Sequence, residues 1–447
     1  MRNFLRNCYM LAALATLPAA VQAQTLYFPP TTGTTWDTMQ PASLGWCPER
    51  IDTLYDYLER SNTKAFILLK DGKIVLEQYF GTFTRDSAWY WASAGKSLTA
   101  FTVGIAQQEG FLSIQDTTSD YLGAGWTAAP AAKEEKITIW HQLTMTSGLD
   151  DAVPDHFCTL DTCLQYEADA GTRWAYHNGP YTLLDDVISQ ATGQTLNAYI
   201  NQKIKVPTGM TGAFFASGYN NVFVSTARSM ARFGLLVLGR GAWNGTQVLT
   251  DTAYFNDMVN TSQNLNQAYG YLWWLNGKAS FMVPTLQTVF PSDISPAAPD
   301  DMYAAIGKDG QLISVVPSQN LVFVRMGLAP NTGDVSFLLM DTIWQNINRL
   351  GDCAVSVERA DSREASAIVL APNVVRAGDA LRWQAAAPLR EAVRWRVIDA
   401  LGRQVASGEW QASEQSGDIA TADLPAGTYV LHLPAAQGGA LRFVVVR

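Results

Sequence analysis

The segment Trp91-Ala92-Ser93-Ala94-Gly95-Lys96-Ser97-Leu98 stands directly before a run with helical periodicity that continues to Gln108. If Ser93 begins that helix, Lys96 lies on the same face, so its amine can reach the serine hydroxyl. A serine hydroxyl is a poor nucleophile until a base takes its proton. A lysine is such a base only when burial or a neighbouring charge lowers its pKa. The segment therefore predicts Ser93 as a nucleophile and Lys96 as a group that moves its proton.

Two further elements support that prediction, which S-x-x-K alone would leave weak because the pattern is common by chance. In Trp174-Ala175-Tyr176-His177-Asn178, Tyr176 can serve as general base and then as acid for the leaving group, and Asn178 can orient the lysine and a substrate carbonyl. The segment Lys308-Asp309-Gly310-Gln311 offers a cation, a close backbone approach and an amide donor for one wall of a site.

The motifs S-x-x-K, Y-x-N and K-x-G, in this order, resemble those of class C serine β-lactamases, D,D-peptidases and their esterase and 6-aminohexanoate-oligomer hydrolase relatives. The resemblance covers roughly residues 48 to 350, and residues 141 to 149, 227 to 239 and 304 to 325 also carry it. It implies a β-lactamase/transpeptidase-like domain. Independently, strand-like runs at both ends of this region with helical runs between them predict an α+β fold, one antiparallel sheet flanked by helices.

Local patterns place four elements in this region. Asp71-Gly72 predicts a hairpin between residues 65 to 69 and 73 to 78, and residues 317 to 320 predict another between residues 312 to 316 and 321 to 326. Residues 98 to 108 and 181 to 191 have the periodicity of helices.

The resemblance also implies a mechanism. Ser93 would attack a carbonyl and form an acyl-enzyme, Lys96 and Tyr176 would move the protons, and the amides of Ser93 and Gln311 would form the oxyanion hole. Asn178, Lys308 and Gly310 would complete the substrate site. The class A elements S-D-N and E-x-x-L-N are absent from the sequence, so deacylation assisted by the tyrosine is expected. Whether Lys96 or Tyr176 accepts the proton in acylation stays open, because the two should titrate as a coupled pair.

The substrate prediction rests on Asp309. β-Lactam-hydrolysing relatives carry Lys-Thr-Gly where this chain has Lys308-Asp309-Gly310, and the aspartate would place negative charge beside the carboxylate of such a drug. Esters and neutral to cationic amides therefore rank above penicillins. A β-lactamase or D,D-peptidase acting on peptidoglycan-type substrates is the first alternative, and a non-catalytic binding or sensor protein of the same fold is the second.

Other chemistries find little support in the sequence. Tyr90 stands where a phosphate-binding loop ending at Lys96 needs glycine, and no G-x-S-x-G nucleophile elbow occurs. The histidines after the leader form no triad with another serine motif, and His177 is predicted as a wall residue: His141, His156, His177 and His432. Neither a metal nor a cofactor is expected, because no cluster of metal ligands is visible.

Two features stay open between alternatives. The aromatic run at residues 268 to 274, with Trp89, Tyr90 and Trp91, predicts either an apolar acyl pocket or core packing. Residues 276 to 303 predict either a flap over the site or a surface loop.

Composition changes near Cys353, after which the sequence has ten Arg, ten Asp plus Glu and no Lys. Beyond this point short alternating runs, such as residues 393 to 397, 429 to 433 and 441 to 446, predict a small Ig-like β-sandwich over residues 356 to 447, with turns at Leu401-Gly402-Arg403 and Pro425-Ala426-Gly427. Residues 397 to 403 and 424 to 429 resemble the sorting modules of type IX secretion. That resemblance implies secretion machinery as a partner; an accessory or carbohydrate-contact domain is the alternative.

The first residues predict export. Arg2 and Arg6 precede an apolar run that ends at Val21-Gln22-Ala23, so residues 1 to 23 are predicted as a signal peptide and residues 24 to 355 as the hydrolase domain. The formal charge of the whole chain is -9, which disfavours nucleic acid and anionic membranes as partners, and no transmembrane segment is predicted. A small-molecule ester or amide is the expected ligand, and the compartment is periplasmic, cell-surface or secreted.

Export places the remaining cysteines in an oxidising compartment, where three pairings are possible. We favour Cys158 with Cys163, which closes a short loop, and Cys47 with Cys353, which ties the two ends of the hydrolase domain together. Free or metal-binding thiols are the alternative.

Overall fold

The computed structural model describes residues 26–330, 336–353, 368–399, 403–433 and 440–446, and it divides into two compact units, Met1–Cys353 and Ala354–Arg447. The predicted signal peptide, the predicted domain boundary at residue 355, and Leu401 and Gly402 of one predicted turn lie outside the described residues. Within the described residues no helix has the length and apolar character needed to cross a bilayer.

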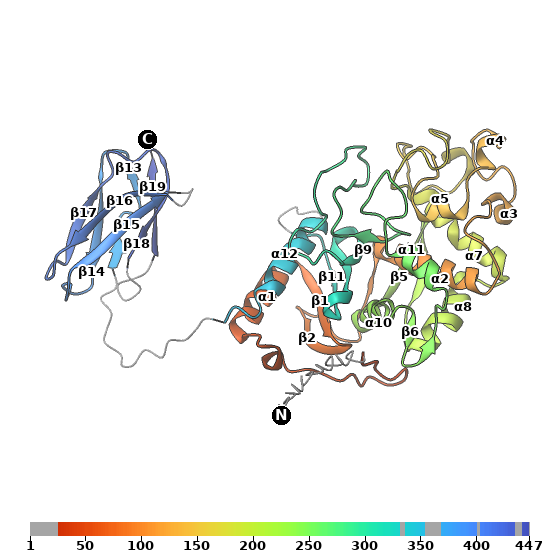
Figure 1. The fold of residues 1–447 in the computed structure, drawn as a ribbon, viewed down its shortest axis with the longest axis horizontal. Coiled ribbons are helices and arrows are strands. Elements are labelled where there is room, and N and C mark those ends of the chain that lie inside the picture. The colour runs from red at the N-terminus through yellow and green to blue at the C-terminus, as the bar shows by residue number, and fades with distance from the viewer. Residues whose placement is uncertain (1–25, 331–335, 354–367, 400–402, 434–439, 447) are drawn as a thin grey trace, which may run out of the picture. The chain divides into compact units, whose positions relative to one another are not determined.

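A sheet of six strands organises the described part of the first unit (Figure 1). Its order is β2-β1-β11-β10-β9-β8, and every neighbouring pair is antiparallel. The strands are β1 (Thr63–Lys70), β2 (Lys73–Tyr79), β8 (Trp274–Leu275), β9 (Tyr303–Gly307), β10 (Gln311–Val316) and β11 (Leu321–Gly327). Both predicted hairpins are confirmed, and the α+β prediction is correct.

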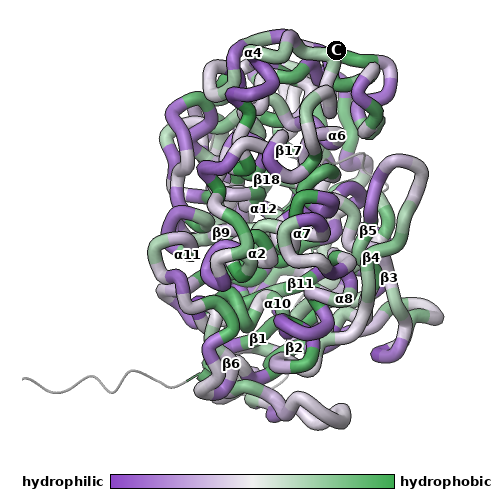
Figure 2. Tube along the Cα trace, turned by 90° about the vertical axis from the view of Figure 1, so that its right-hand side faces the viewer, coloured by the Kyte–Doolittle hydropathy of each residue, from purple (hydrophilic) through white to green (hydrophobic). Residues whose placement is uncertain are grey.

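Continuous apolar runs explain why the sheet is buried on both faces. All residues of β10 and β11 are buried, and such runs are typical of strands covered on two sides. Helix α10 (Ala227–Leu238) packs on β1, β10 and β11, while α1 (Pro48–Arg60) and α12 (Ser336–Asn348) pack on each other and on the sheet. Figure 2 shows hydrophobic colour at β1.

A helical lobe is inserted between β2 and the later strands. It contains α2 (Gly95–Gln108), α3 (Ser119–Leu122), α4 (Ala131–Glu134), α5 (Ile139–Leu143), α6 (Asn178–Thr182), α7 (Leu184–Thr192), α8 (Leu196–Ile200) and α9 (Val206–Thr208). A small sheet of β3 (Ala88–Tyr90), β5 (Asn220–Thr226) and β4 (Ala213–Ser217) borders it. The hairpin β6 (Ala242–Trp243) to β7 (Thr246–Gln247) and helix α11 (Thr252–Met258) follow.

The helix predicted over residues 181 to 191 is divided in the structure. α6 ends at Thr182 and α7 begins at Leu184, with Leu183 still in a helical conformation. Thr182 Oγ1 donates to the carbonyl oxygen of Asn178 at 2.9 Å, and the backbone bond from Leu183 N to Gly179 O is long at 3.4 Å. A side chain that competes for a helical carbonyl weakens the regular bonding at that turn.

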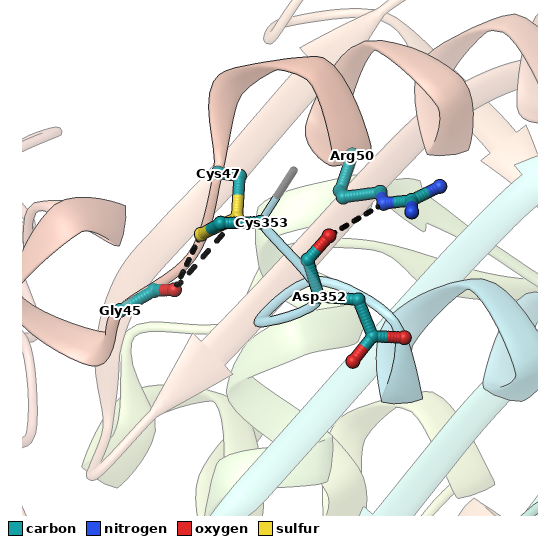
Figure 3. Close-up of a disulfide and its surroundings, with 5 residues drawn as sticks. All are labelled: Gly45, Cys47, Arg50, Asp352 and Cys353. Carbon is teal, nitrogen blue, oxygen red and sulfur yellow. Dashed lines mark hydrogen bonds between the residues drawn. A yellow bond between two sulfur atoms is a disulfide. The ribbon is translucent and has the colours of Figure 1, made fainter. Parts of the chain in front are cut away.

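Two disulfides join the pairs favoured from the sequence. Cys47, before α1, is bonded to Cys353, after α12, with Cα atoms 5.4 Å apart (Figure 3). Beside it, Arg50 Nε donates to the carbonyl oxygen of Asp352 at 2.9 Å. The second disulfide joins Cys158 to Cys163. The first bond therefore closes almost the whole first unit into a covalent ring.

The second unit is a β-sandwich with one apolar core. One sheet has the order β12 (Ile368–Leu370), β14 (Ala380–Ala385) and β17 (Ser416–Ala420). The other has the order β13 (Val374–Arg376), β19 (Ala440–Val446), β18 (Gly427–His432), β15 (Val393–Asp399) and β16 (Gln404–Trp410). Trp383 and Trp410 stack in the core with ring centroids 4.1 Å apart. The predicted alternation in β15 is confirmed, because Val393 and Val397 are buried and Arg394 and Arg396 are exposed.

Candidate active site

Ser93 lies in a tight turn that leads into α2. The turn, η2 (Ala92–Ala94), begins at Ala92 with a φ of 46°, a left-handed conformation that is strained for a residue with a side chain. One turn later Lys96 is buried, and its Nζ lies 3.3 Å from Ser93 Oγ. The structure therefore brings together the two residues that the first motif predicted.

The lysine stands in an apolar setting. Burial lowers the pKa of Lys96 to about 7, although the charge of Asp185 opposes this shift. Its Nζ lies 4.0 Å from the ring centroid of Tyr181 and 5.4 Å from that of Tyr176. A lysine with a pKa near 7 is partly neutral at neutral pH, so it can accept a proton.

The pKa of Tyr176 is shifted in the opposite direction to that of Lys96. Burial raises its pKa well above the usual range, and a hydrogen bond with Ser93 opposes the shift only in part. The ring stacks on Trp274 of β8, with centroids 5.9 Å apart and an angle of 17° between the planes. Tyr176 is therefore a protonated hydrogen-bond donor at neutral pH, and the base and acid tendencies of the site are separated between Lys96 and Tyr176.

A cavity of about 500 Å³ opens beside Ser93. Its wall is mainly apolar and comes from the helical lobe, the ends of β8 and β9, and the start of α12. The lining residues are Ser93, Asp151, His156, Tyr176, Asn178, Trp274, Val283, Pro284, Thr285, Leu286, Ile306, Gly307, Lys308, Ser336 and Phe337. Residues 283 to 286 belong to the segment left open as flap or surface loop, and they cover part of this cavity. Gln287 Nε2 anchors the segment by donating to the carbonyl oxygen of Trp174 at 3.0 Å.

The segment that begins at Lys308 lies only partly in the cavity wall. A Cβ on Gly307 would collide with the carbonyl oxygen of Trp91 and lie 3.1 Å from Ala94 N, so the end of β9 packs directly on the Ser93 turn. Lys308 follows and lines the cavity, whereas Gly310 and Gln311 do not. The reason is the turn η5 (Lys308–Gly310), which reverses the chain and pairs Gln311 with Gly307 in the sheet.

The side chains after Lys308 are occupied elsewhere. Gln311 Nε2 donates to the carbonyl oxygen of Gly327 at 2.7 Å, and Gly310 N donates to Ser336 Oγ at 3.3 Å. The Asp309 carboxylate accepts a hydrogen bond from Tyr90 Oη at 2.7 Å, and Asp309 is not part of the cavity lining. Asp309, the residue behind the ranking of esters above penicillins, therefore lies outside the cavity lining, and that ranking stays a prediction.

Several polar atoms near Tyr176 are buried without a hydrogen-bond partner in the structure. Asn178 lines the cavity with Oδ1 unpartnered, and both ring nitrogens of the buried His177 lack partners. Burial lowers the pKa of His177 to about 4, so the ring is neutral at neutral pH. His156 lines the cavity, and His141 instead caps α5 through Thr138. Unpartnered polar groups beside a cavity are positions where substrate or water can bind.

Some of the aromatic residues singled out in the sequence line the cavity, and others are packed in the core. Trp274 lines the cavity, with Phe337 packed edge-on against it at 4.8 Å. Tyr269 and Trp273 are buried, and Trp91 donates through Nε1 to Ser225 Oγ at 2.8 Å inside the core. Of the residues in the described chain, no group of three or more His, Cys, Asp or Glu side chains is placed to hold a metal ion.

Comparison with known proteins identifies the family. The sequence model of the beta-lactamase family matches residues 59–327, more than half of the chain. The chain belongs to the beta-lactamase family. Members of the beta-lactamase family are serine hydrolases, and this chain is therefore a serine hydrolase of that family.

Curated relatives are distant in sequence. An uncharacterized protein of Alkalihalophilus pseudofirmus is 25% identical over 308 residues, which cover 60% of this chain and 84% of the relative. Penicillin-binding protein 4* of Bacillus subtilis is 26% identical over 188 residues, 36% of this chain and 40% of that protein. The latter match thus spans less than half of the relative's length.

Solved structures of the family share the fold. A Bacteroides dorei protein provisionally named a beta-lactamase superposes with a TM-score of 0.56 at 16% identity, covering 69% of this chain and 100% of its own. A Bacillus anthracis protein provisionally named a 6-aminohexanoate-dimer hydrolase gives 0.53 at 18% identity, covering 71% and 87%. The beta-lactamase/D-alanine carboxypeptidase of Yersinia pestis gives 0.51 at 16% identity, covering 69% and 98%.

Sequence reasoning missed two residues of this beta-lactamase-family site. Asp185 is buried and acts electrostatically on Lys96, and Asn221 donates through Nδ2 to Asp185 Oδ2 at 2.7 Å. A signal for Asp185 was present: it follows Tyr181 by one helical turn, so an acid occupies the apolar face of a predicted helix. For Asn221, which lies on a small separate sheet, we find no sequence signal.

Proposed function

We propose that this protein is an exported serine hydrolase that cleaves an ester or amide through an acyl-enzyme on Ser93. The observation that carries the proposal is the 3.3 Å distance from Lys96 Nζ to Ser93 Oγ at the wall of a cavity that Tyr176 also lines. The separated pKa tendencies support one assignment of roles, with Lys96 as the general base and Tyr176 as the general acid.

The proposed reaction starts with neutral Lys96 taking the proton of Ser93 while Ser93 Oγ bonds to the carbonyl carbon. The amides of Ser93 and Lys308 replace the predicted Ser93 and Gln311 pair as donors to the oxyanion, because Lys308 lines the cavity and Gln311 does not. Tyr176 then protonates the leaving group as its bond to carbon breaks, and the proton held by Lys96 returns to Tyr176. Water releases the acid by the same steps in reverse.

The cavity wall supports a substrate with an apolar part. Trp274, Leu286 and Phe337 lie in the wall, and burial of apolar surface stabilises a bound chain by about 25 cal/mol per Å². Asp151 also lines the cavity, but Arg173 Nη2 pairs with its carboxylate at 2.5 Å. An uncharged ester or amide with an apolar acyl or leaving group therefore fits this wall.

A peptidoglycan-directed activity, as β-lactamase or D,D-peptidase, is the second candidate, and Lys308 is the observation that favours it. This lysine is exposed and lines the cavity near Ser93, so it can pair with a substrate carboxylate. The Asp309 carboxylate is bonded to Tyr90 Oη and is not part of the cavity lining.

The decisive experiment compares the purified protein with Ser93→Ala on four substrates: a short-chain p-nitrophenyl ester, a 6-aminohexanoate amide, a chromogenic cephalosporin and a D-Ala-D-Ala peptide. Mass spectrometry records any covalent adduct. We expect ester or amide turnover and an adduct on wild type, both lost in Ser93→Ala. Turnover of the cephalosporin or peptide alone would select the second candidate. Absence of turnover and adduct would leave a binding role.

Export and sorting are separate parts of the proposal. The leader pattern of residues 1 to 23 and the two disulfides support an oxidising compartment, and the resemblance of the second unit supports type IX sorting. Protein recovered from an expressing bacterium should begin at Gln24; an intact Met1 would contradict export. A reporter fused to residues 354 to 447 should reach the surface of a host that has type IX secretion, and retention inside would favour an accessory domain.

A further inference from the structure

A buried carboxylate that the proposed mechanism does not use lies on α7, the helix that packs on α2. Asp185 occupies the first turn of α7 and is 8% exposed. Asn221 Nδ2 donates to its Oδ2 at 2.7 Å, while Oδ1 is buried without a hydrogen-bond partner in the structure. A buried carboxylate with an unpartnered oxygen costs free energy unless a positive charge stabilises it.

Lys96 is a buried cation on α2, the helix on which α7 packs. Tyr181 Oη approaches Thr99 Oγ1 of α2 at 3.4 Å, and Lys96 Nζ stands 4.0 Å from the face of the same tyrosine ring. Asp185 follows Tyr181 by one helical turn, so it shares the face that packs on α2. Among the described residues, Asp185 is the charged group that raises the pKa of Lys96.

We propose that Asp185 is a positioning residue for Lys96, a buried counter-charge that stabilises the ammonium formed when Lys96 takes the proton of Ser93. The proposal rests on the acyl-enzyme function proposed above and adds a group that touches neither the substrate nor the reacting atoms. It acts only through Lys96.

The other titratable groups around the pair do not supply this charge. Tyr176 and Tyr181 face Lys96, Tyr269 faces both tyrosines, and burial keeps all three phenols protonated. Asp186 is beside Asp185 but exposed, and Lys308 lies across the cavity with a charge of the wrong sign. Burial raises the pKa of Asp185 to about 7 and lowers that of Lys96 to about 7, so the two share protons in the same pH range.

The sign of the effect follows from Coulomb's law. A carboxylate near Lys96 favours the ammonium, so removal of its charge lets the amine lose its proton at lower pH. In any reaction that needs neutral Lys96, the increase of rate with pH should then occur at lower pH. A weaker base also transfers the proton less well, so the rate on the plateau should fall.

The test measures the rate at which a fluorophosphonate modifies the full-length protein between pH 5 and 9. In this reaction Ser93 Oγ bonds to phosphorus, fluoride leaves, and the serine proton passes to Lys96. In Asp185→Asn, the amide oxygen can still accept from Asn221, so only the charge is lost. Asp185→Glu keeps the charge, and Asp186→Asn is the matched control because it removes an acid from the same helical turn at an exposed position.

For Asp185→Asn we expect the acidic limb to move to lower pH by about 0.5 to 1 unit and the plateau rate to fall about two- to threefold. Asp185→Glu should keep the limb of wild type, and Asp186→Asn should keep both limb and plateau. A lower plateau with an unmoved limb in Asp185→Asn, with thermal unfolding as in wild type, would show a merely structural role and overturn the proposal. If wild type and Ser93→Ala react alike, the proposed function itself fails, which is a different result.

Discussion

At the scale of single residues, Lys96 and Tyr176 contact the same serine, and burial moves their pKa values in opposite directions. Because Lys96 has a lowered pKa of about 7, its neutral form grows as pH rises through 7. We expect kcat/KM for an aryl ester to rise about tenfold per pH unit below pH 7 and to level off above it. Lys96→Met should lower kcat/KM about a thousandfold. A flat profile between pH 5 and 9 would contradict the assignment of Lys96 as base.

The protonated state of Tyr176 leads to a prediction about leaving groups. An amide nitrogen must be protonated before it leaves, whereas p-nitrophenolate leaves without help. Tyr176→Phe keeps the stack on Trp274 and removes only the hydroxyl. We expect amide turnover to fall by about 100-fold or more and p-nitrophenyl ester turnover by about tenfold, measured as kcat/KM on the same preparation. Equal losses on both substrates would assign Tyr176 another role.

The residues differ in how far the sequence could place them. Ser93 and Lys96 are three positions apart on one helical turn, so local geometry alone brings them together. Lys308 could be expected near the site. The turn after it was not predicted, although Asp309-Gly310 is the same turn dipeptide as Asp71-Gly72 and Asp309 has a left-handed φ of 63°. Asp185 lies on α7, and the packing of α7 on the helix of Lys96 is a contact between two helices that no local pattern encodes.

At the scale of elements, the turn η5 depends on a buried arginine. Arg325 of β11 donates to the carbonyl oxygens of Asp309 and Gly310 at 2.9 and 2.7 Å and, with its other nitrogens, to Ser61, Leu328 and Thr63. Arg325→Met would leave these oxygens buried and unpaired. We expect the free energy of unfolding in urea to fall by about 3 kcal/mol. Catalysis should weaken as well, because Lys308 begins this turn.

The control for that prediction is Arg349→Met, an exposed arginine shortly after α12. Its replacement should change the unfolding free energy by less than about 0.5 kcal/mol. If the two variants unfold alike, the hydrogen bonds of Arg325 do not stabilise the turn as proposed.

At the scale of the whole molecule, the two disulfides should differ in what they stabilise. The Cys47–Cys353 bond joins residues 306 positions apart, and the Cys158–Cys163 bond joins residues 5 apart. Loop-closure entropy makes the long loop the more stabilising of the two by about 3 to 4 kcal/mol. We expect the double serine variant of Cys47 and Cys353 to unfold at clearly lower denaturant than that of Cys158 and Cys163.

The second variant pair also has a kinetic readout. Gly179 N donates to the carbonyl oxygen of His156 at 3.0 Å, so the loop closed by Cys158 and Cys163 packs next to Asn178. Loss of the Cys158–Cys163 bond should raise KM, whereas the free energy of unfolding should change little. The reverse ranking of the two pairs in stability would contradict the entropic argument.

The overall topology was predictable where strands are neighbours in sequence and not where they are remote. Apolar runs and turn signals predicted both hairpins of the central sheet. The insertion of β11 between β1 and β10 was not predictable, because Thr63 pairs with Gly327 across most of the first unit and such remote pairing leaves no local pattern. The clustering of strands at both ends of this region predicted only that the two ends meet.

The bond between Cys47 and Cys353 also has a mechanical consequence. Any tension on the chain beyond residue 353 enters the first unit at a cysteine that is covalently joined to the start of α1. The force is shared between α1 and α12, which pack against each other. Helix α12 therefore cannot detach from the sheet one turn at a time from its C-terminal end. If the second unit holds the protein at a surface under flow, the cavity beside Ser93 is shielded from that pull.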